Sequence, residues 1–260
     1  MQTMTTSGKE RSGNGLRPWK IGTGLAVYLI GVAAFAAFAV ARCRTEGLLA
    51  VLLFTESALV AGGVVLIAAA VDPRGVGVRG FVVTVSAVSL LMLAATGPAL
   101  LIVLTNGAGP LGGALLAQLL ILTFCLLLAS VFALVRCVGA ELFSAQLVCI
   151  LVACALMGTV FYVDPLVEAD QSPETRSVVI TAALAANPMT AMSWSLLRYD
   201  LMHGQIMYDR VSVIGRWHRI PDIQWWQTAC GYAAGSVLFF LGAAECRRRR
   251  LSRLVNAGGS

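Results

Sequence analysis

The stretch LGGALLAQLLILTFCLLLASVFALV, at residues 111–135, decides the fold of this chain. It contains no charged side chain in 25 residues, and a membrane-spanning helix needs about 20 mostly apolar residues. Five more apolar stretches of similar length lie before and after it, at residues 19–41, 47–71, 80–105, 142–163 and 226–244. The sequence therefore predicts an all-α, polytopic membrane protein with six transmembrane helices.

The composition of the 260-residue chain leads to the same prediction. Hydrophobic residues make up 58% of it and charged residues 12%, whereas soluble domains carry about 25% charge. This composition excludes a soluble enzyme, a disordered chain and a nucleic-acid-binding domain. The net charge of +6 comes from basic residues beside the apolar stretches, where they orient a protein in the membrane. We therefore expect a lipid bilayer, and no nucleic acid, as a partner.

The distribution of charge predicts the orientation of the chain. Residues 164–225 hold seven acidic residues and five arginines, whereas basic residues predominate before residue 19 and after residue 244. Because connections rich in Lys and Arg stay in the cytoplasm, we expect both termini to be cytoplasmic and the protein to be a multi-pass protein of the inner (cytoplasmic) membrane. The chain then divides into a flexible leader (1–18), five spans (19–163), an extracytoplasmic segment (164–225), a sixth span (226–244) and a basic cytoplasmic tail (245–260).

The extracytoplasmic segment carries its own helical signals. Apolar residues recur at helical spacing in 176–186 and again in 189–203. Asn187 and Pro188 separate the two stretches, and this pair is a typical helix break and helix start. We therefore expect two short helices, re-entrant or interfacial, packed on the outer mouth of the bundle.

These features together carry a resemblance to a known family. Six predicted spans stand in a chain of 260 residues, the largest outer segment lies between spans five and six, and it contains NPMTAMSWSLLR at 187–198. This pattern resembles the membrane subunit of type-2 ABC exporters. The resemblance implies a permease subunit that forms half of a translocation path, dimerises with itself or a relative, and is coupled to a cytoplasmic ATPase. The chain differs from that family in its Gly- and Ser-rich leader and in the short connection 72–79, where the family carries a coupling helix.

Nucleotide binding is expected to come from a separate subunit. The chain has two lysines, Lys9 and Lys20, and neither stands in the P-loop pattern. The charged residues of the two predicted inner connections would then be the contacts available to an ATPase. These candidate docking residues are Asp72, Arg74, Arg79, Arg136 and Glu141.

Glu56 is the ionisable residue that lies deepest in an apolar stretch. An unpaired carboxylate near the bilayer centre costs roughly 2.5–3.5 kcal/mol, so the side chain is expected to face the protein interior. No Lys or Arg lies at comparable depth in another stretch. Two interpretations stay open: a substrate or proton site, and a structural hydrogen bond to another span or subunit, with Gln118 or Gln146 as possible partners.

No catalytic or metal-binding pattern stands out. The chain contains no GxSxG, no HExxH and no CxxC sequence, so we expect no catalytic residue, no metal and no cofactor. The alternative to a permease is a structural or assembly subunit of a larger membrane complex, because few intramembrane charges and many small residues also suit a packing role.

Overall fold

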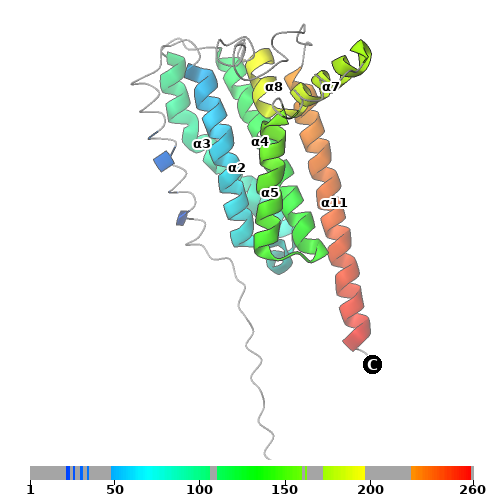
Figure 1. The fold of residues 1–260 in the computed structure, drawn as a ribbon. Coiled ribbons are helices and arrows are strands. Elements are labelled where there is room, and N and C mark those ends of the chain that lie inside the picture. Colours follow the sequence, from blue (N-terminus) through cyan, green and yellow to red (C-terminus); the bar gives the residue numbers. More distant parts are fainter. Residues whose placement is uncertain are drawn as a thin grey trace, which may run out of the picture.

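The computed structural model describes residues 48–105, 110–159, 172–196 and 224–258, with isolated positions at 22–23, 26, 30–31, 34 and 162. The predicted leader 1–18 and most of the predicted span 19–41 lie outside these residues. Every regular element within the described ranges is a helix (Figure 1). The all-α prediction is therefore confirmed for this part of the chain.

Five of the helices form an antiparallel bundle (Figure 1). They are α2 (Leu48–Val71), α3 (Pro73–Thr105), α4 (Leu111–Val138), α5 (Leu142–Met157) and α11 (Trp225–Gly258). Among the described residues, α2, α3, α4 and α11 are long and apolar enough to cross a membrane. These helices suggest a multi-pass membrane protein, which is the coarser part of the sequence prediction.

Helix α5 is shorter than the stretch predicted to form it. It ends at Met157 and has 16 residues, or about 24 Å at 1.5 Å per residue, against a hydrocarbon core of about 30 Å. Gly158 follows, and its N–H closes the last turn on the carbonyl of Cys154. A Cβ at Gly158 would lie 2.8 Å from that carbonyl oxygen and 2.9 Å from the ring of Tyr162. The turn at this glycine therefore ends α5, and the described positions just beyond it, Thr159 and Tyr162, are again helical.

Two other helix boundaries differ from the predicted ones, because the end of a helix and the edge of the lipid depend on different properties of the sequence. The predicted connection 72–79 is largely helical: Asp72 adopts φ 36°, Pro73 starts α3, and Gly77 interrupts it with φ 85°. The predicted basic tail 245–260 continues α11 as helix up to Gly258. Hydropathy marks where the apolar residues stop, whereas the backbone hydrogen bonds of a helix can continue into polar sequence.

The stretch at 111–135 occupies the centre of the bundle. Helix α4 packs against α2, α3, α5 and α11, and its Phe124, Leu128 and Phe132 are fully buried. The ring of Phe132 stacks on Phe81 of α3, with centroids 6.1 Å apart. Phe124 meets Tyr232 of α11 at 5.5 Å. A helix that is apolar all round can contact neighbours on several sides, and α4 does so from Leu120 onward, whereas Leu111, Leu115, Leu116 and Leu119 near its start are exposed.

The bundle has two distinct ends. The arginine end consists of residues 72–79, 136–141 and 246–256, where the α2–α3 and α4–α5 connections meet the last part of α11. The capped end carries two short helices, α7 (Pro173–Ala186) and α8 (Pro188–Ser195), beside the start of α11 (Figure 1). The prediction of two short helices separated at Asn187-Pro188 is confirmed; α8 ends at Ser195, and the rest of the stretch predicted for the second helix, 197–203, lies outside the described residues.

Candidate functional site

Glu56 lies inside the bundle between three helices. It belongs to α2 and is 2% exposed. Its Oε2 accepts a hydrogen bond of 2.6 Å from Nε2 of Gln118 on α4. The hydroxyl of Thr96 on α3 lies 2.6 Å from its Oε1. Gln118 was one of the two partners expected from the sequence, and Thr96 was not expected. The carboxyl group therefore joins α2, α3 and α4 through side chains of this chain alone.

The geometry around Thr96 favours the neutral form of the acid. The Thr96 hydroxyl lies 2.6 Å from Oε1 of Glu56 and 2.7 Å from the carbonyl oxygen of Leu93. A hydroxyl has one proton, so it can donate to only one of these two oxygens. If Glu56 is a carboxylic acid, it donates to the Thr96 oxygen and Thr96 donates to Leu93, so that both acceptors are used. Burial of the group favours the same uncharged state.

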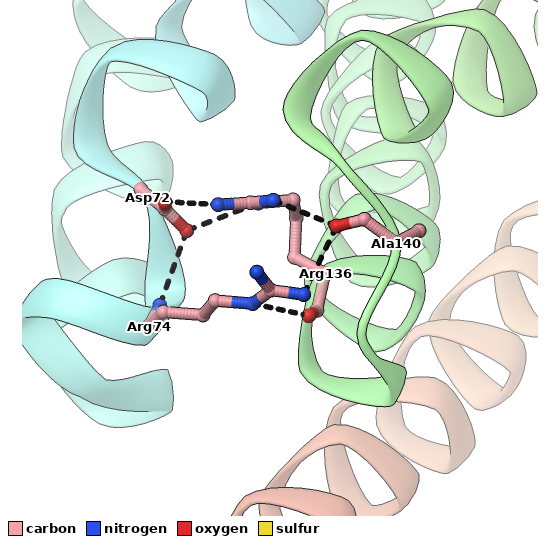
Figure 2. Close-up of polar contacts among 4 residues, drawn as sticks. All are labelled: Asp72, Arg74, Arg136 and Ala140. Carbon is pink, nitrogen blue, oxygen red and sulfur yellow. Dashed lines mark hydrogen bonds and ion pairs between the residues drawn. The ribbon is translucent and has the colours of Figure 1, made fainter.

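A second polar group connects the two turns of the arginine end (Figure 2). The buried guanidinium of Arg136 forms an ion pair with Asp72 through Nη2, and its Nε donates to Asp72 Oδ1 at 3.2 Å. Its Nη1 donates to the carbonyl of Ala140 at 2.7 Å. Arg74 donates from Nε to the carbonyl of Arg136 at 2.6 Å and from Nη2 to that of Ala140 at 3.0 Å. The carbonyls of Arg136, in the last turn of α4, and of Ala140, just beyond the helix, thus accept from arginines, and cations are favoured at this end of a helix.

The local sequence explains how these groups are positioned. Asp72 stands between α2 and α3 with φ 36°, and its side chain accepts from the N–H of Arg74 at 3.2 Å. Asp is one of the few residues that tolerate this backbone region and bond their own chain two residues on. Gly139 closes α4 with φ 132°, a conformation that favours glycine. The two turns therefore present their polar groups to each other.

The candidate docking residues fall into two groups. Arg136 is 7% exposed, and its ion pair with Asp72 and its contacts with Arg74 lie within the protein. Arg79 and Glu141 are exposed. At the arginine end Arg79 and Glu141 are therefore accessible from outside the bundle, while the other three candidates connect the two turns.

Asn187 connects two helix ends at the capped end. It is 2% exposed, and its Oδ1 accepts from the backbone N–H groups of Met189 and Thr190 at the start of α8. Its Nδ2 donates to the carbonyl of Met157, the last residue of α5, at 2.8 Å. Pro188 occupies the first helical position of α8, where its missing N–H costs nothing. The residues that the sequence singled out as a helix break thus also join α8 to α5.

Hydroxyl groups from α8, from α11 and from Thr159 just beyond α5 satisfy the end of α7. The last four carbonyls of a helix have no partner within it, and here each accepts from a side chain. The donors are Thr159 to Ala183 at 2.9 Å, Thr190 to Leu184 at 2.5 Å, Thr228 to Ala185 at 2.7 Å and Tyr232 to Ala186 at 2.6 Å. Sequence reasoning missed all four donors. The signal for them is weak: isolated hydroxyl residues near the ends of apolar stretches.

Helix α8 lies over the bundle end. Its Ala191 and Met192 are fully buried, and Leu196 just beyond it is 5% exposed. It packs against α2, α4, α5 and α11. A Cβ at Gly113, near the start of α4, would overlap the carbonyl oxygen of Leu196, so the glycine permits this close approach. The bundle is therefore closed at the capped end by a short, buried helix.

The described residues contain no group of three or more His, Cys, Asp or Glu side chains that could hold a metal ion. Comparisons with protein-family models, with curated proteins and with solved structures find no match to this chain.

Proposed function

We propose that this chain is the permease subunit of an ATP-driven exporter, forming half of a translocation path in the cytoplasmic membrane and coupled to a separate ATPase. The observation that carries the proposal is the asymmetry of the bundle. One end is covered by α8, whose Ala191 and Met192 are fully buried, and the other exposes charged groups on two short turns. A path for a substrate would open between α8 and the helix ends below it, and an ATPase would act on the turns at the arginine end.

The exposed pair Arg79 and Glu141 supports docking at that end. Arg79 follows the break at Gly77, and Glu141 precedes α5. The network of Asp72, Arg74 and Arg136 connects the two turns, so a force on one turn would be transmitted to both α3 and α4. With its basic residues the arginine end would face the cytoplasm, where ATP is hydrolysed.

The second candidate is a structural or assembly subunit of a larger membrane complex. The observation that favours it is that most apolar residues of α11 and several of α3 are exposed, for example Leu238 at 68% and Val83 at 62%. Such faces fit lipid, a second permease subunit or another membrane protein. The hydrogen bonds of Glu56 within the chain also suit a structural role.

Co-expression with a Walker-motif ATPase encoded beside this chain tests the proposal. Purification of the complex and reconstitution in nanodiscs should give co-purification and a raised rate of ATP hydrolysis. A charge exchange, Arg79→Glu with Glu141→Arg, keeps the net charge and should weaken the complex. The matched control, Glu174→Arg with Arg176→Glu, exchanges charges at the start of α7 and should leave binding unchanged.

Two outcomes would contradict the proposal at different levels. If no neighbouring ATPase co-purifies or is stimulated, the permease function is wrong. If the ATPase binds the 79/141 exchange as tightly as the wild type, docking lies at another surface and only the assignment of Arg79 and Glu141 fails.

A further inference from the structure

The last part of α11 extends beyond the bundle and brings a dense positive charge with it. The helix has 34 residues, or about 51 Å, whereas about 30 Å is enough to cross the hydrocarbon core. From the two tryptophans at its start, the helix covers that core by about residue 245. The following residues project past the ends of the other helices at the arginine end (Figure 1). The first of them therefore stand at the depth of the lipid headgroups, a layer about 5–7 Å thick on each side of the core, and the last ones reach beyond it.

The projecting part has two faces. Arg249, Arg250 and Arg253 follow one another at helical spacing and, with Cys137, Val138 and Cys246, line a hollow of about 290 Å³ beside the end of α4. The opposite face carries Leu251, Leu254 and Val255, which are 53%, 65% and 74% exposed. The guanidinium of Arg247 packs where a Cβ on Gly77 would lie, which fixes α11 against the break in α3.

The positive charge of the hollow exceeds the negative charge beside it among the described residues. Glu245 is the one acidic residue in this part of α11, and it pairs with Arg248 at 2.9 Å and Arg249 at 2.7 Å. Arg250 and Arg253 have no carboxylate partner in the described ranges. The positive charge of Arg250 also repels that of Arg74 on the neighbouring turn. An anion in the hollow would relieve this repulsion.

We propose that the hollow binds the phosphate of an anionic lipid headgroup, with Arg249, Arg250 and Arg253 as its donors. Guanidinium groups match phosphate oxygens in bidentate geometry, and basic pockets beside membrane helices bind anionic headgroups. Val138, which lines the hollow, is 69% exposed and gives an acyl chain an apolar surface next to the charges. This site does not depend on the permease function.

The rate of thiol alkylation at Cys246 measures occupancy of the site. The full chain in neutral detergent would be titrated with short-chain phosphatidylglycerol, short-chain phosphatidylcholine or inorganic phosphate. Peptide mass spectrometry would then measure the rate at which N-ethylmaleimide labels each cysteine. Cys246 lines the hollow, whereas Cys230, near the other end of α11, is exposed and serves as the internal control. We expect phosphatidylglycerol to slow labelling of Cys246 and to leave Cys230 unchanged.

Matched variants separate the site from general charge. Arg250→Gln with Arg253→Gln removes two charges that line the hollow and should weaken phosphatidylglycerol binding about thirtyfold, on the scale that each basic residue contributes at an anionic surface. Arg79→Gln with Arg248→Gln removes two exposed charges of the same end that do not line the hollow and should change binding less than about threefold. Arg247 is left unchanged in both variants, because its guanidinium packs against Gly77.

Four results would overturn the proposal. Equal protection by phosphatidylcholine would exclude recognition of the anionic phosphate group. Equal protection by inorganic phosphate at the same concentration would assign the hollow to free phosphate instead of lipid. Equal loss of binding in both variants would reduce the effect to net charge. Loss of ATPase binding in the 250/253 variant with unchanged lipid protection would assign the arginines to a protein partner.

Discussion

Replacement of Glu56 tests whether the buried acid is a neutral, hydrogen-bonded group. In Glu56→Gln the side-chain amide keeps the size of the acid and has one donor group and one acceptor. Its NH₂ can donate to Thr96, as the carboxylic acid would, and its oxygen can accept from Gln118. Because no hydrogen bond of the neutral acid is lost, we expect the free energy of unfolding to change by less than about 0.5 kcal/mol.

Glu56→Ala removes the hydrogen-bonding groups that Glu56→Gln preserves. The two contacts, each 2.6 Å long, are interhelical, and such hydrogen bonds contribute about 0.6 kcal/mol on average in membrane proteins, up to about 1.7 kcal/mol. The truncation also leaves a cavity at a position that is 2% exposed, and the amide of Gln118 loses its acceptor. We therefore expect a loss of about 2–4 kcal/mol.

Equilibrium unfolding in mixed micelles, driven by SDS and followed by circular dichroism, gives the required free energies. A double-mutant cycle of Glu56→Ala with Gln118→Ala should give a coupling of about 0.6–1.7 kcal/mol. If Glu56→Gln is as destabilised as Glu56→Ala, the neutral acid is refuted. A Gln variant that folds normally in the exporter complex but no longer transports substrate would instead assign Glu56 to proton or cation transfer.

Four further substitutions test the two ends of the bundle by the same unfolding measurement. Asn187→Ala should lower the free energy of unfolding by about 2 kcal/mol, because it removes both an N-cap and a hydrogen bond to the end of α5. Asn187→Asp keeps only the capping oxygen, so its stability should fall between that of the Ala variant and the wild type. Wild-type stability of the Ala variant would contradict the double contact. Arg136→Gln should cost about 2–3 kcal/mol, because it leaves the partly buried Asp72 without its counter-ion; restoration by a second change, Asp72→Asn, checks that the charge is the cause. Tyr232→Phe should cost about 1 kcal/mol through the lost hydroxyl while the ring contact with α4 remains, and a larger loss would show that the ring had moved. Gly113→Ala should cost about 1–3 kcal/mol by overpacking against the residue after α8, and a neutral result would place α8 farther from α4 than the structure does.

The parts of the structure that could be predicted from the sequence depend on local chemistry. Asn187 and Pro188 mark a helix start wherever the surrounding chain lies, because the capping side chain and the missing N–H act within four residues. Glu56 was recognisable because a single acid in an apolar helix needs a partner. Gln118 could be named since few amides stand in the other spans.

The features that could not be predicted depend on where whole helices lie. In an apolar helix a threonine hydroxyl commonly donates to a carbonyl of its own helix, and Thr96 also reaches the carbonyl of Leu93. Nothing in the sequence therefore assigns Thr96 to Glu56. The contact of Arg74 with Ala140 joins positions 66 residues apart and exists only once α3 and α4 are adjacent. The helical continuation of α11 past residue 244 is likewise invisible to hydropathy, which reports the lipid boundary.

The two ends of the bundle are held by different chemistry, and this difference has a consequence for motion. At the capped end the contacts are neutral: hydroxyl and amide groups bond the carbonyls that end α5 and α7. Salt does not screen such bonds. At the arginine end the contacts are charged, but Arg136 is 7% exposed, and buried pairs are screened far less than exposed ones. The exposed ion pairs of Glu245 with Arg248 and Arg249 are the ones that salt weakens. Because both pairs lie within α11, a rise in ionic strength should first weaken the helical structure of its projecting part, while α8 and the connected turns keep their places. Movement of α8 requires the breaking of neutral hydrogen bonds. A partner acting on α3 and α4 would have to transmit the force for this through the packed core around Phe81 and Phe132.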